Sequence, residues 1–469
     1  MLPPLVEIVP FSASQLAAFA QRKARIVIPG SKSITNRAIV LAALGDGIVT
    51  LRGALWSEDT EAMTECMRKL GILVEVQPDP HVDANRVITV HGCGGALPSS
   101  GTEEAPVELF VQNAGTAARF LTAMLCLGSG VVRLSGVPRM HERPQRELIR
   151  ALRELGYRID TPNDKLPAVV YGGGRRAGPV TVSVDDSSQF ASALLLSSRV
   201  GGWEVAVPEG SNPDELPYVE MTRRMIEVFP HKGGTFQIEP DASSASYFHA
   251  VNSLFPDIRP VQVLACQPPK TEGGSGWQID AEFPRVAPQR AAGAGGSEEE
   301  RVDEKRRKSS LEISRKSELG DSIMTAIVIA PLAGTTCVFT NLGVLRKQEC
   351  ERVHALRDEL SKCKADVTEM GDTLTISPSS ADKLGDASIS TYHDHRMAMC
   401  FATLGFVVGG IKLQDPNCVR KTVPSFFQIL AAPPPEGLGV EIWECDTVTG
   451  QRTRRLTEKE DLLATSAAP

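Results

Sequence analysis

Side chains that suit phosphate binding occur in short groups along this chain, each where an apolar helix is expected to begin. The six groups are Ser31-Lys32-Ser33, Asn113-Ala114-Gly115-Thr116, Asp186-Ser187-Ser188-Gln189, Asp241-Ala242-Ser243-Ser244, Gly320-Asp321-Ser322 and Asp394-His395-Arg396. The first turn of a helix leaves backbone N–H groups unpaired and carries the positive end of the helix dipole, so anions bind there. If several of these ends lie together, the pattern predicts a ligand with more than one negative charge.

The first group and a later stretch of arginines each allow two interpretations. Ser33 and Arg37 are one helical turn apart and share a helix face, which favours an anion site over an exposed polar turn. The sequence Gly-Ser-Lys-Ser lacks the upstream glycine spacing of a nucleotide-binding P-loop. Arg139, Arg143 and Arg146 are typical either of an anion site or of a surface turn paired with neighbouring glutamates.

Strands followed by helices must position these groups. We expect strands at 25–28, 131–134, 180–184 and 337–340, and helices at 34–44, 117–127, 190–197, 245–254, 323–330 and 397–408. The groups recur about every seventy residues, which fits βαβ-containing units better than solenoid repeats. Six such units suggest two halves of three.

The composition is that of an ordinary α/β enzyme with two domains, with 469 residues of which 42% are hydrophobic. The formal net charge is -7 and the basic residues are scattered, which argues against a nucleic-acid-binding protein. Ten cysteines without metal-ligand spacing favour buried, reduced thiols. Because no apolar run has membrane-spanning length and no secretory signal is apparent, we expect a cytoplasmic protein, with no metal or nucleotide cofactor.

Two stretches do not follow the repeating pattern. Residues 281–310 include a charge-dense run with few large apolar side chains, so we expect a mobile insertion there. Residues 433–469 contain Arg452, Arg454 and Arg455 followed by several acidic residues. We expect this second stretch to be a solvated C-terminal extension.

Six segments, in order, resemble the enolpyruvyl transferase family, and within it the 3-phosphoshikimate 1-carboxyvinyltransferases, also called EPSP synthases. The segments are 29–37, 113–119, 138–144, 184–190, 241–247 and 392–399, and the resemblance runs from about Ile26 to Leu430. It implies an α/β fold with two domains, each an inside-out α/β barrel of three βαβ-type units. Residues 30–239 would form one domain, and residues 1–29 and 240–432 the other.

The resemblance also implies a reaction and the residues that perform it. The enolpyruvyl group of phosphoenolpyruvate would pass to the 5-hydroxyl of shikimate 3-phosphate, and phosphate would be released. Asp321 would be the base and Glu349 the proton donor, while Lys32 would stabilise charge on both substrates. The implied substrate-binding residues are Lys32, Ser33, Arg37, Asn113, Gly115, Thr116, Arg143, Ser187, Ser188, Gln189, Tyr218, Asp321, Gln348, Arg352, Arg396 and Lys421.

The same resemblance implies no cofactor, no nucleic acid and no membrane partner. The chain would act as a monomer or as one part of a multi-enzyme polypeptide of the shikimate pathway. From the residues alone, a helix cap is the favoured interpretation of Asp321, and a surface pair with Arg352 that of Glu349.

Three residues depart from the family pattern. Gln348 stands where many relatives have a lysine, and Val344 where many have an asparagine. Glu215 replaces a serine, and a carboxylate there would repel a phosphate unless it is paired. These departures keep a catalytically silent binding domain as an alternative. A UDP-N-acetylglucosamine enolpyruvyl transferase is disfavoured, because Ser33 follows Lys32 and residues 139–143 include no cysteine.

Overall fold

The computed structural model describes residues 2–98, 101–210, 215–290 and 310–465, which divide into two compact units. The first unit comprises residues 29–241 and 276–278, and the second comprises residues 1–28, 242–275 and 279–469. This division lies close to the one expected at residues 30 and 240, except that residues 276–278 join the first unit.

The first unit contains seven helices and ten strands among its described residues. The helices are α2 (Lys32–Leu44), α3 (Glu58–Lys69), α4 (Gly115–Leu125), α5 (Pro138–Glu142), α6 (Arg146–Glu154), α7 (Gln189–Gly201) and α8 (Leu216–Val228). The strands are β3 (Ile48–Leu55), β4 (Val74–Pro78), β5 (Asn85–His91), β6 (Val107–Phe110), β7 (Val131–Ser135), β8 (Ile159–Asp160), β9 (Ala168–Tyr171), β10 (Gly178–Thr181), β11 (Trp203–Ala206) and β12 (Gly234–Gln237).

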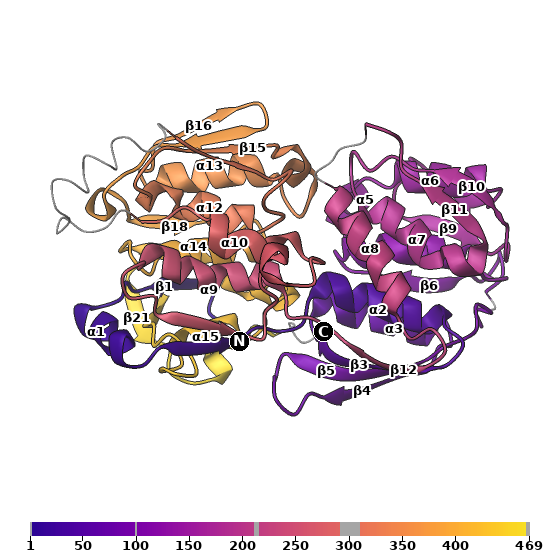
Figure 1. Ribbon diagram of the computed structural model, residues 1–469, viewed down its shortest axis with the longest axis horizontal. Coiled ribbons are helices and arrows are strands. Elements are labelled where there is room, and N and C mark those ends of the chain that lie inside the picture. Colours follow the sequence, from indigo (N-terminus) through magenta and orange to yellow (C-terminus); the bar gives the residue numbers. More distant parts are fainter. Residues whose placement is uncertain (1, 99–100, 211–214, 291–309, 466–469) are drawn as a thin grey trace. The chain divides into compact units, whose positions relative to one another are not determined.

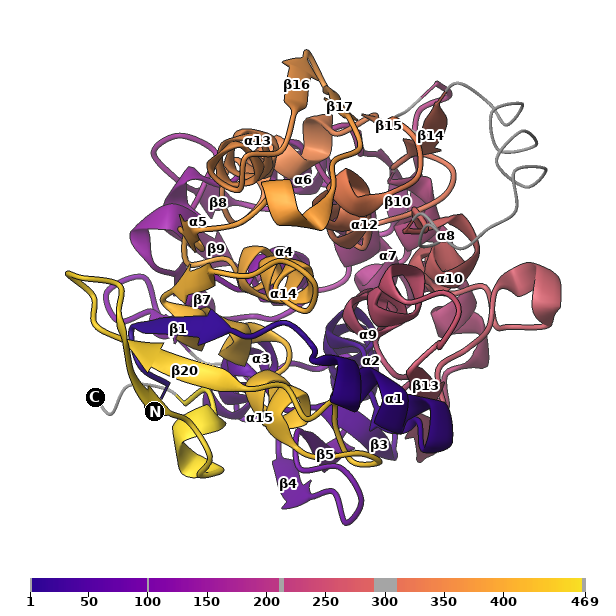
Figure 2. The same ribbon diagram turned by 90° about the vertical axis from the view of Figure 1, so that its left-hand side faces the viewer.

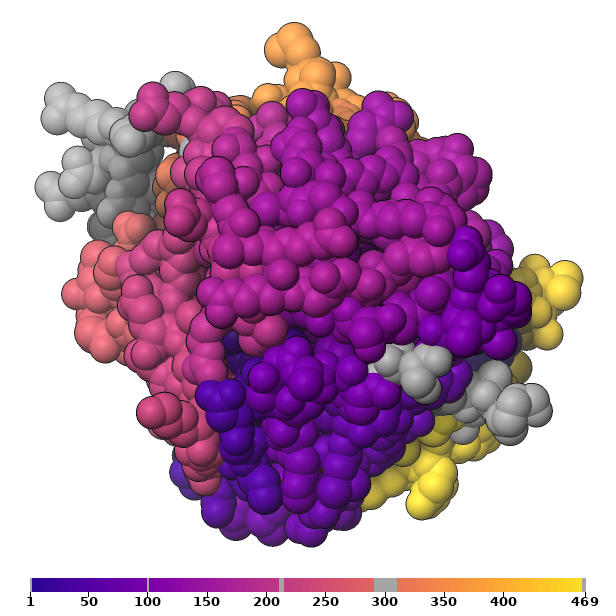
Figure 3. Space-filling model, turned by 90° about the vertical axis from the view of Figure 1, so that its right-hand side faces the viewer, coloured from indigo at the N-terminus to yellow at the C-terminus, as the bar shows by residue number. Residues whose placement is uncertain are grey.

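Three helices form the interior of the first unit. Every residue of α4 is buried, and apart from Thr116, Arg119 and Thr122 its residues are glycine or apolar. The helices α2, α4 and α7 contact one another, and the strands form sheets of order β12-β3-β5-β4, β6-β7-β9-β8 and β10-β11. Figure 1 shows α2 next to β3, and α7 near β11. Figure 3 shows that segments far apart in sequence adjoin on the surface of this unit.

The second unit has the remaining elements. Its α-helices are α1 (Ala13–Gln21), α9 (Ala242–Leu254), α10 (Phe283–Val286), α12 (Ile323–Ile329), α13 (Arg352–Lys362), α14 (His395–Leu404) and α15 (Phe426–Ala431). Its strands are β1 (Leu5–Ile8), β2 (Ala24–Val27), β13 (Val261–Leu264), β14 (Leu311–Ser314), β15 (Cys337–Thr340), β16 (Val367–Met370), β17 (Thr373–Ile376), β18 (Ala387–Ile389), β19 (Ile411–Gln414), β20 (Ile442–Cys445) and β21 (Arg452–Arg455). The short 3-10 helices include η2 (Ile279–Glu282), η4 (Gly343–Lys347) and η6 (Pro416–Lys421).

The second unit repeats the arrangement of three contacting helices and three sheets. The helices α9, α12 and α14 contact one another, and every residue of α12 and α14 is buried. The sheets have the orders β18-β19-β1-β20-β21, β14-β15-β17-β16 and β13-β2. Figure 2 shows β1 and β20 side by side, which agrees with their antiparallel pairing.

The structure confirms the expected helices and strands. The six helices correspond to α2, α4, α7, α9, α12 and α14, and the four strands to β2, β7, β10 and β15, with ends shifted by a few residues. None of the described helices is long and apolar enough to cross a membrane.

The expectation of a solvated C-terminal extension is wrong. The strand β20 pairs with β1, and Ile442, Leu456 and Leu462 are buried in the core of the second unit. Leu438 and Val440, which precede β20, are buried as well. The apolar alternation at 438, 440 and 442 is typical of a strand, but the charged residues after it obscured that pattern.

The expected mobile insertion at 281–310 begins too early. Residues 281–286 belong to η2 and α10, where Phe283 is fully buried in the core. Residues 291–309 lie outside the described residues.

Candidate active site

Three arginines surround the carboxylate of Asp321 in the second unit. Asp321 lies immediately before the start of α12, with 19% of its side chain exposed. Its Oδ2 is 3.2 Å from Arg396 Nη2 and 3.8 Å from Arg352 Nη1, and its Oδ1 is 3.5 Å from Arg315 Nη2. The arginines come from the starts of α14 and α13 and from the residue after β14.

The charges around Asp321 determine its protonation. Burial by itself raises the pKa of Asp321, because desolvation disfavours the charged form. The charges of Arg396, Arg352 and Arg315 outweigh burial and hold the pKa well below its usual range, while the negative charge of Glu349 opposes them. Asp321 is therefore ionised at neutral pH although little of it meets solvent.

Arg352 connects three carboxylates. Its Nε lies 2.7 Å and its Nη2 3.2 Å from the two carboxylate oxygens of Asp394, which is fully buried. The same Nη2 is 2.9 Å from Glu349 Oε2, and Nη1 faces Asp321. Burial lowers the pKa of Arg352, but Asp394, Glu349 and Asp321 raise it above its usual value. Arg352 is thus a permanent cation held by its neighbours.

Glu349 lies between two cations in the same cluster. Its Oε1 is 3.2 Å from Lys421 Nζ, and its Oε2 contacts Arg352. Only 9% of the Glu349 side chain and 6% of the Lys421 side chain are exposed. A surface ion pair with Arg352 is therefore the wrong description of Glu349.

The two departures near this cluster have different consequences. Gln348 donates from Nε2 to Asp321 Oδ1 at 3.4 Å and accepts a hydrogen bond from Arg352, so this neutral amide lies among the charged groups. Val344 is a buried apolar residue of η4, and no contact between it and the charged cluster is observed among the described residues.

At the N-terminal ends of two helices of the second unit, carboxylates of the protein accept hydrogen bonds from backbone N–H groups. The Asp394 side chain accepts from Arg396 N at 2.9 Å and caps α14. Asp280 accepts from Ser322 N, at the start of α12, at 3.2 Å. Internal carboxylates thus accept from one backbone N–H at each of these two helix ends, and the binding of an external anion there stays a prediction.

In the first unit, Lys32 and Arg37 belong to the first turns of α2. Lys32 Nζ forms an ion pair with the buried Asp59 at 3.2 Å. Arg37 is 2% exposed and donates to Thr222 Oγ1 at 2.8 Å and to Ser192 Oγ at 3.1 Å. Burial lowers the pKa of Arg37 to about 10, while Tyr218 acts in the opposite direction. Arg37 Nη1 also donates to the backbone oxygen of Ser33 at 2.9 Å, so these hydrogen-bond acceptors of the guanidinium are uncharged oxygens.

Two arginines converge on Gly115 at the start of α4. A Cβ atom on Gly115 would lie 2.5 Å from Arg119 Nη1 and 2.6 Å from Arg143 Nη2. Arg143 also donates to the backbone oxygen of Asn113 at 3.0 Å, and its buried Nε has no hydrogen-bond partner among the described residues. The N-cap residue of α4 is Ala114, which has no side-chain group to cap the helix. This end suits an anion.

The side chain of Glu215, the residue before α8, reaches the start of α7. Its buried carboxylate accepts from the backbone N–H of Ser188 at 2.6 Å. Ser187 Oγ accepts from Gln189 N at 3.2 Å, so this end is also partly satisfied from within. A phosphate bound at the start of α7 would compete with the Glu215 carboxylate for the backbone N–H of Ser188. This is where the repulsion expected from Glu215 would act.

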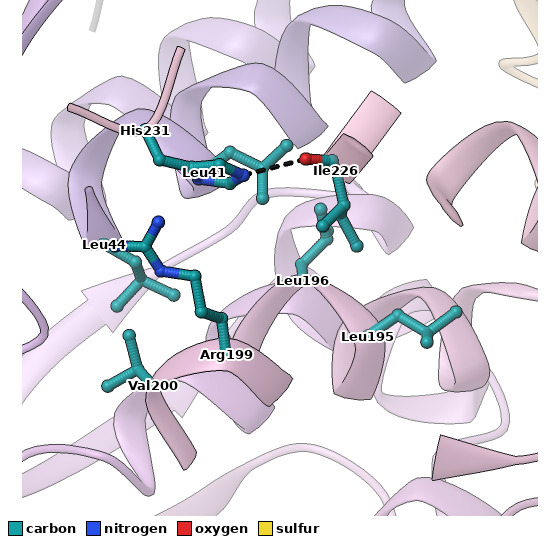
Figure 4. A pocket seen from close by; sticks show the side chains of 8 residues that line it. All are labelled: Leu41, Leu44, Leu195, Leu196, Arg199, Val200, Ile226 and His231. Atoms are coloured by element: carbon teal, nitrogen blue, oxygen red, sulfur yellow. Dashed lines mark hydrogen bonds between the residues drawn. The ribbon is translucent and has the colours of Figure 1, made fainter. Parts of the chain in front are cut away.

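A hollow elsewhere in the first unit differs chemically from these clusters. Figure 4 shows its lining residues: Leu41, Leu44, Leu195, Leu196, Arg199, Val200, Ile226 and His231. Arg199 is paired with Asp46 at 2.5 Å, and the remaining lining is mainly apolar. This hollow does not suit a ligand with two phosphates.

The predicted site residues thus form clusters within the two units. Lys32, Ser33, Arg37, Asn113, Gly115, Thr116, Arg143, Ser187, Ser188, Gln189 and Tyr218 belong to the first unit, and Asp321, Gln348, Glu349, Arg352, Arg396 and Lys421 to the second. Sequence reasoning missed Asp280 and Arg315, both of which neighbour Asp321. A buried arginine after a strand gives no recognisable sequence pattern.

Known proteins match nearly the whole chain. A family model described as EPSP synthase (3-phosphoshikimate 1-carboxyvinyltransferase) matches residues 18–430. A curated 3-phosphoshikimate 1-carboxyvinyltransferase of Nostoc sp. is 35% identical over 424 residues, with 86% of this chain and 95% of the relative covered. The protein of the same name from Opitutus terrae is 36% identical over 460 residues, with 92% and 97% covered.

A solved structure shares the fold. The EPSP synthase of Acinetobacter baumannii has a TM-score of 0.65 and 22% sequence identity, and the match covers 94% of this chain and 100% of that chain. This likeness shows an α/β enolpyruvyl transferase fold.

Proposed function

Because the chain belongs to the EPSP synthase family, we propose that its clusters of charged residues transfer the 1-carboxyvinyl group of phosphoenolpyruvate to the 5-hydroxyl of shikimate 3-phosphate, with release of phosphate. The enzyme is a transferase of the shikimate pathway, which leads to the aromatic amino acids. The observation that carries its mechanism is the ionised, nearly buried carboxylate of Asp321 among three arginines.

Asp321 is the base that takes the proton of the 5-hydroxyl. A carboxylate with a strongly lowered pKa is a weak base, so its basicity has to rise when the substrates bind. The phosphate and carboxylate of phosphoenolpyruvate supply this change, because they pair with Arg352 and Arg396 and offset the charges that hold the pKa down. The arginines thereby couple substrate binding to proton transfer.

Glu349 is the donor that protonates the methylene carbon of phosphoenolpyruvate. Lys421 and Arg352 hold it in two ion pairs. Anions of the substrate compete for both cations and release the carboxylate to carry a proton. Addition of the 5-hydroxyl oxygen to the protonated double bond gives a tetrahedral adduct. The adduct then loses phosphate while the Glu349 carboxylate takes a proton back from its methyl group, so that the carbon–carbon double bond forms again.

The first unit binds shikimate 3-phosphate in this proposal. The hydroxyl, amide and cationic groups at the starts of α2 and α7 recognise its phosphate and carboxylate, through Lys32, Ser33, Arg37, Ser187, Ser188, Gln189 and Tyr218. The start of α4, with Asn113, Gly115, Thr116 and Arg143, contributes a further anion site for phosphoenolpyruvate. Arg37 is suited to this role because its buried charge is bonded to uncharged hydroxyl groups.

Buried helices surrounded by sheets support two inside-out α/β barrels as the finer description of the fold. The domain limits, a cytoplasmic location, and activity as a monomer or within a multi-enzyme polypeptide stay predictions.

We expect Arg315→Gln to move the acidic limb of the kcat profile to higher pH by about one unit or more. Arg315 lowers the pKa of Asp321, so its loss raises that pKa, and the base becomes protonated at a higher pH. Arg315→Lys should restore most of the profile. The control is Arg357→Gln, which removes an exposed arginine of α13 that pairs with Asp358 and Glu369. An acidic limb that stays in place in Arg315→Gln would contradict the role of Arg315.

We expect Glu215→Gln to bind shikimate 3-phosphate about five- to tenfold more tightly, because it removes a negative charge that competes for Ser188 N–H. Isothermal titration calorimetry measures the dissociation constant. The matched control is Glu220→Gln on the same helix, where the exposed glutamate pairs with Arg224. Unchanged or weaker binding by Glu215→Gln would show that the phosphate binds elsewhere.

A phosphate-release assay tests the function itself. We expect release only when both phosphoenolpyruvate and shikimate 3-phosphate are present, and none when UDP-N-acetylglucosamine replaces the latter. A folded protein that binds shikimate 3-phosphate but releases no phosphate would instead be a silent binding domain.

A further inference from the structure

Asp280 is a buried carboxylate that lies in η2 of the second unit and is only 4% exposed. Its Oδ1 accepts three hydrogen bonds: from Gly320 N at 2.7 Å, from Ser322 N at 3.2 Å and from Ser322 Oγ at 2.6 Å. Its Oδ2 accepts a hydrogen bond from Ser243 Oγ, near the start of α9. One side chain therefore fixes two parts of the chain that are remote from it in sequence.

The three bonds to Oδ1 hold the backbone on both sides of Asp321. Gly320 and Ser322 are the residues immediately before and after it, so their N–H groups define the direction in which the Asp321 side chain leaves the backbone. That direction brings Asp321 to Arg396, Arg352 and Arg315. A catalytic group misplaced by about 1 Å loses much of its rate advantage, on the order of 10²-fold.

We propose that Asp280 is a positioning residue for Asp321, which fixes the Gly320–Ser322 turn so that the Asp321 carboxylate faces its three arginines. This inference rests on the proposed role of Asp321 as the base. Asp280 itself takes no part in proton transfer, since its oxygens are used by the turn and by Ser243.

The contacts of Asp280 need oxygen acceptors and no negative charge. Burial raises the pKa of Asp280, although its bonds to Ser243 and Ser322 act in the opposite direction. An asparagine has nearly the same shape. Its amide oxygen accepts the three bonds that Oδ1 accepts, and its NH₂ group donates to the Ser243 hydroxyl, which then acts as an acceptor.

The test compares Asp280→Asn, Asp280→Ala and the control Ser243→Ala. We expect Asp280→Ala to lower kcat about 10²-fold, with a KM for shikimate 3-phosphate that changes less than about threefold because the residues proposed to bind it belong to the first unit. We expect Asp280→Asn and Ser243→Ala to keep kcat within about fivefold of the wild type, since both retain the acceptors for the turn.

Amide hydrogen exchange provides a readout that does not depend on activity. Peptides that contain Gly320 and Ser322 should exchange faster in Asp280→Ala and at the wild-type rate in Asp280→Asn. Unchanged exchange or an unchanged kcat in Asp280→Ala would overturn the proposal. An equal loss of kcat in Asp280→Asn and Asp280→Ala would also overturn it, because the charge would then matter.

Two further results keep the test interpretable. Circular dichroism detects whether Asp280→Ala folds. If it does not fold, Asp280→Asn tests the proposal instead, and a large loss of kcat in that variant would contradict a positioning role. The exchange of the Gly320 and Ser322 amides tests whether Asp280 holds the turn, and kcat of Asp321→Asn tests whether Asp321 is the base. The two proposals can therefore fail independently.

Discussion

Asp321→Asn is expected to lower kcat by about 10³-fold, within the range that a general base contributes. Asparagine keeps the size of the side chain and an oxygen for the three arginines but cannot accept the proton of the 5-hydroxyl. The dissociation constant of shikimate 3-phosphate should change little, because the groups proposed to bind it belong to the first unit. Phosphate release measured at saturating substrates gives kcat, and calorimetry gives the dissociation constant.

A control variant shows the effect of losing a carboxylate elsewhere in the second unit. Asp372→Asn removes an exposed carboxylate of the same unit that pairs with Arg346, and it should leave kcat unchanged. Turnover of Asp321→Asn within about threefold of the wild type would remove the base assignment, since general-base catalysis supplies about 10²-fold or more.

Arg352→Met is expected to lower the free energy of unfolding by about 3 to 5 kcal/mol, because breaking a buried ion pair leaves its partner charged and desolvated. The affected partners are Asp394, which is fully buried, and Glu349 and Asp321. Urea denaturation followed by circular dichroism measures the change. Arg357→Met is the matched control on the same helix, since Arg357 and its partner Asp358 are exposed, although its other partner, Glu369, is mostly buried.

The destabilisation of Arg352→Met should depend on pH in a definite direction. Without the guanidinium, the folded variant loses one of the charges that hold down the pKa of Asp321, and burial, which raises that pKa, is opposed less. Protonation then favours the folded state, so the difference between variant and wild type should shrink as pH falls. A destabilisation below about 1 kcal/mol, the size typical of an exposed pair, would show that Arg352 is not the centre of this cluster.

The helices and strands that position the site could be predicted because their signals are local. Apart from Arg119, the residues of α4 are small or apolar, which predicts a buried helix. Gly45 directly after the last residue of α2 predicts where that helix ends. The burial of the C-terminal residues is harder to predict, because it depends on a contact that is distant in sequence. The pairing of β20 with β1 joins the two ends of the chain and leaves no local trace beyond a short apolar alternation.

The site itself was only partly accessible from the sequence. Family resemblance named Asp321, Glu349 and Arg352, and the structure brings these three together. The resemblance did not point to Arg315 or Asp280, because their importance arises from tertiary contacts with the turn that contains Asp321. The contact of Glu215 with Ser188 N–H likewise depends on the packing of α8 near α7.

The central claim is that the arginines keep Asp321 ionised until the substrates neutralise them. Carbon-13 NMR of aspartate carboxyl groups, with the Asp321 signal assigned from Asp321→Asn, measures its pKa directly. We expect a pKa well below the usual range in the free protein and a rise when shikimate 3-phosphate and a non-reactive phosphoenolpyruvate analogue are bound together. An Asp321 signal that titrates identically with and without these ligands would contradict the account.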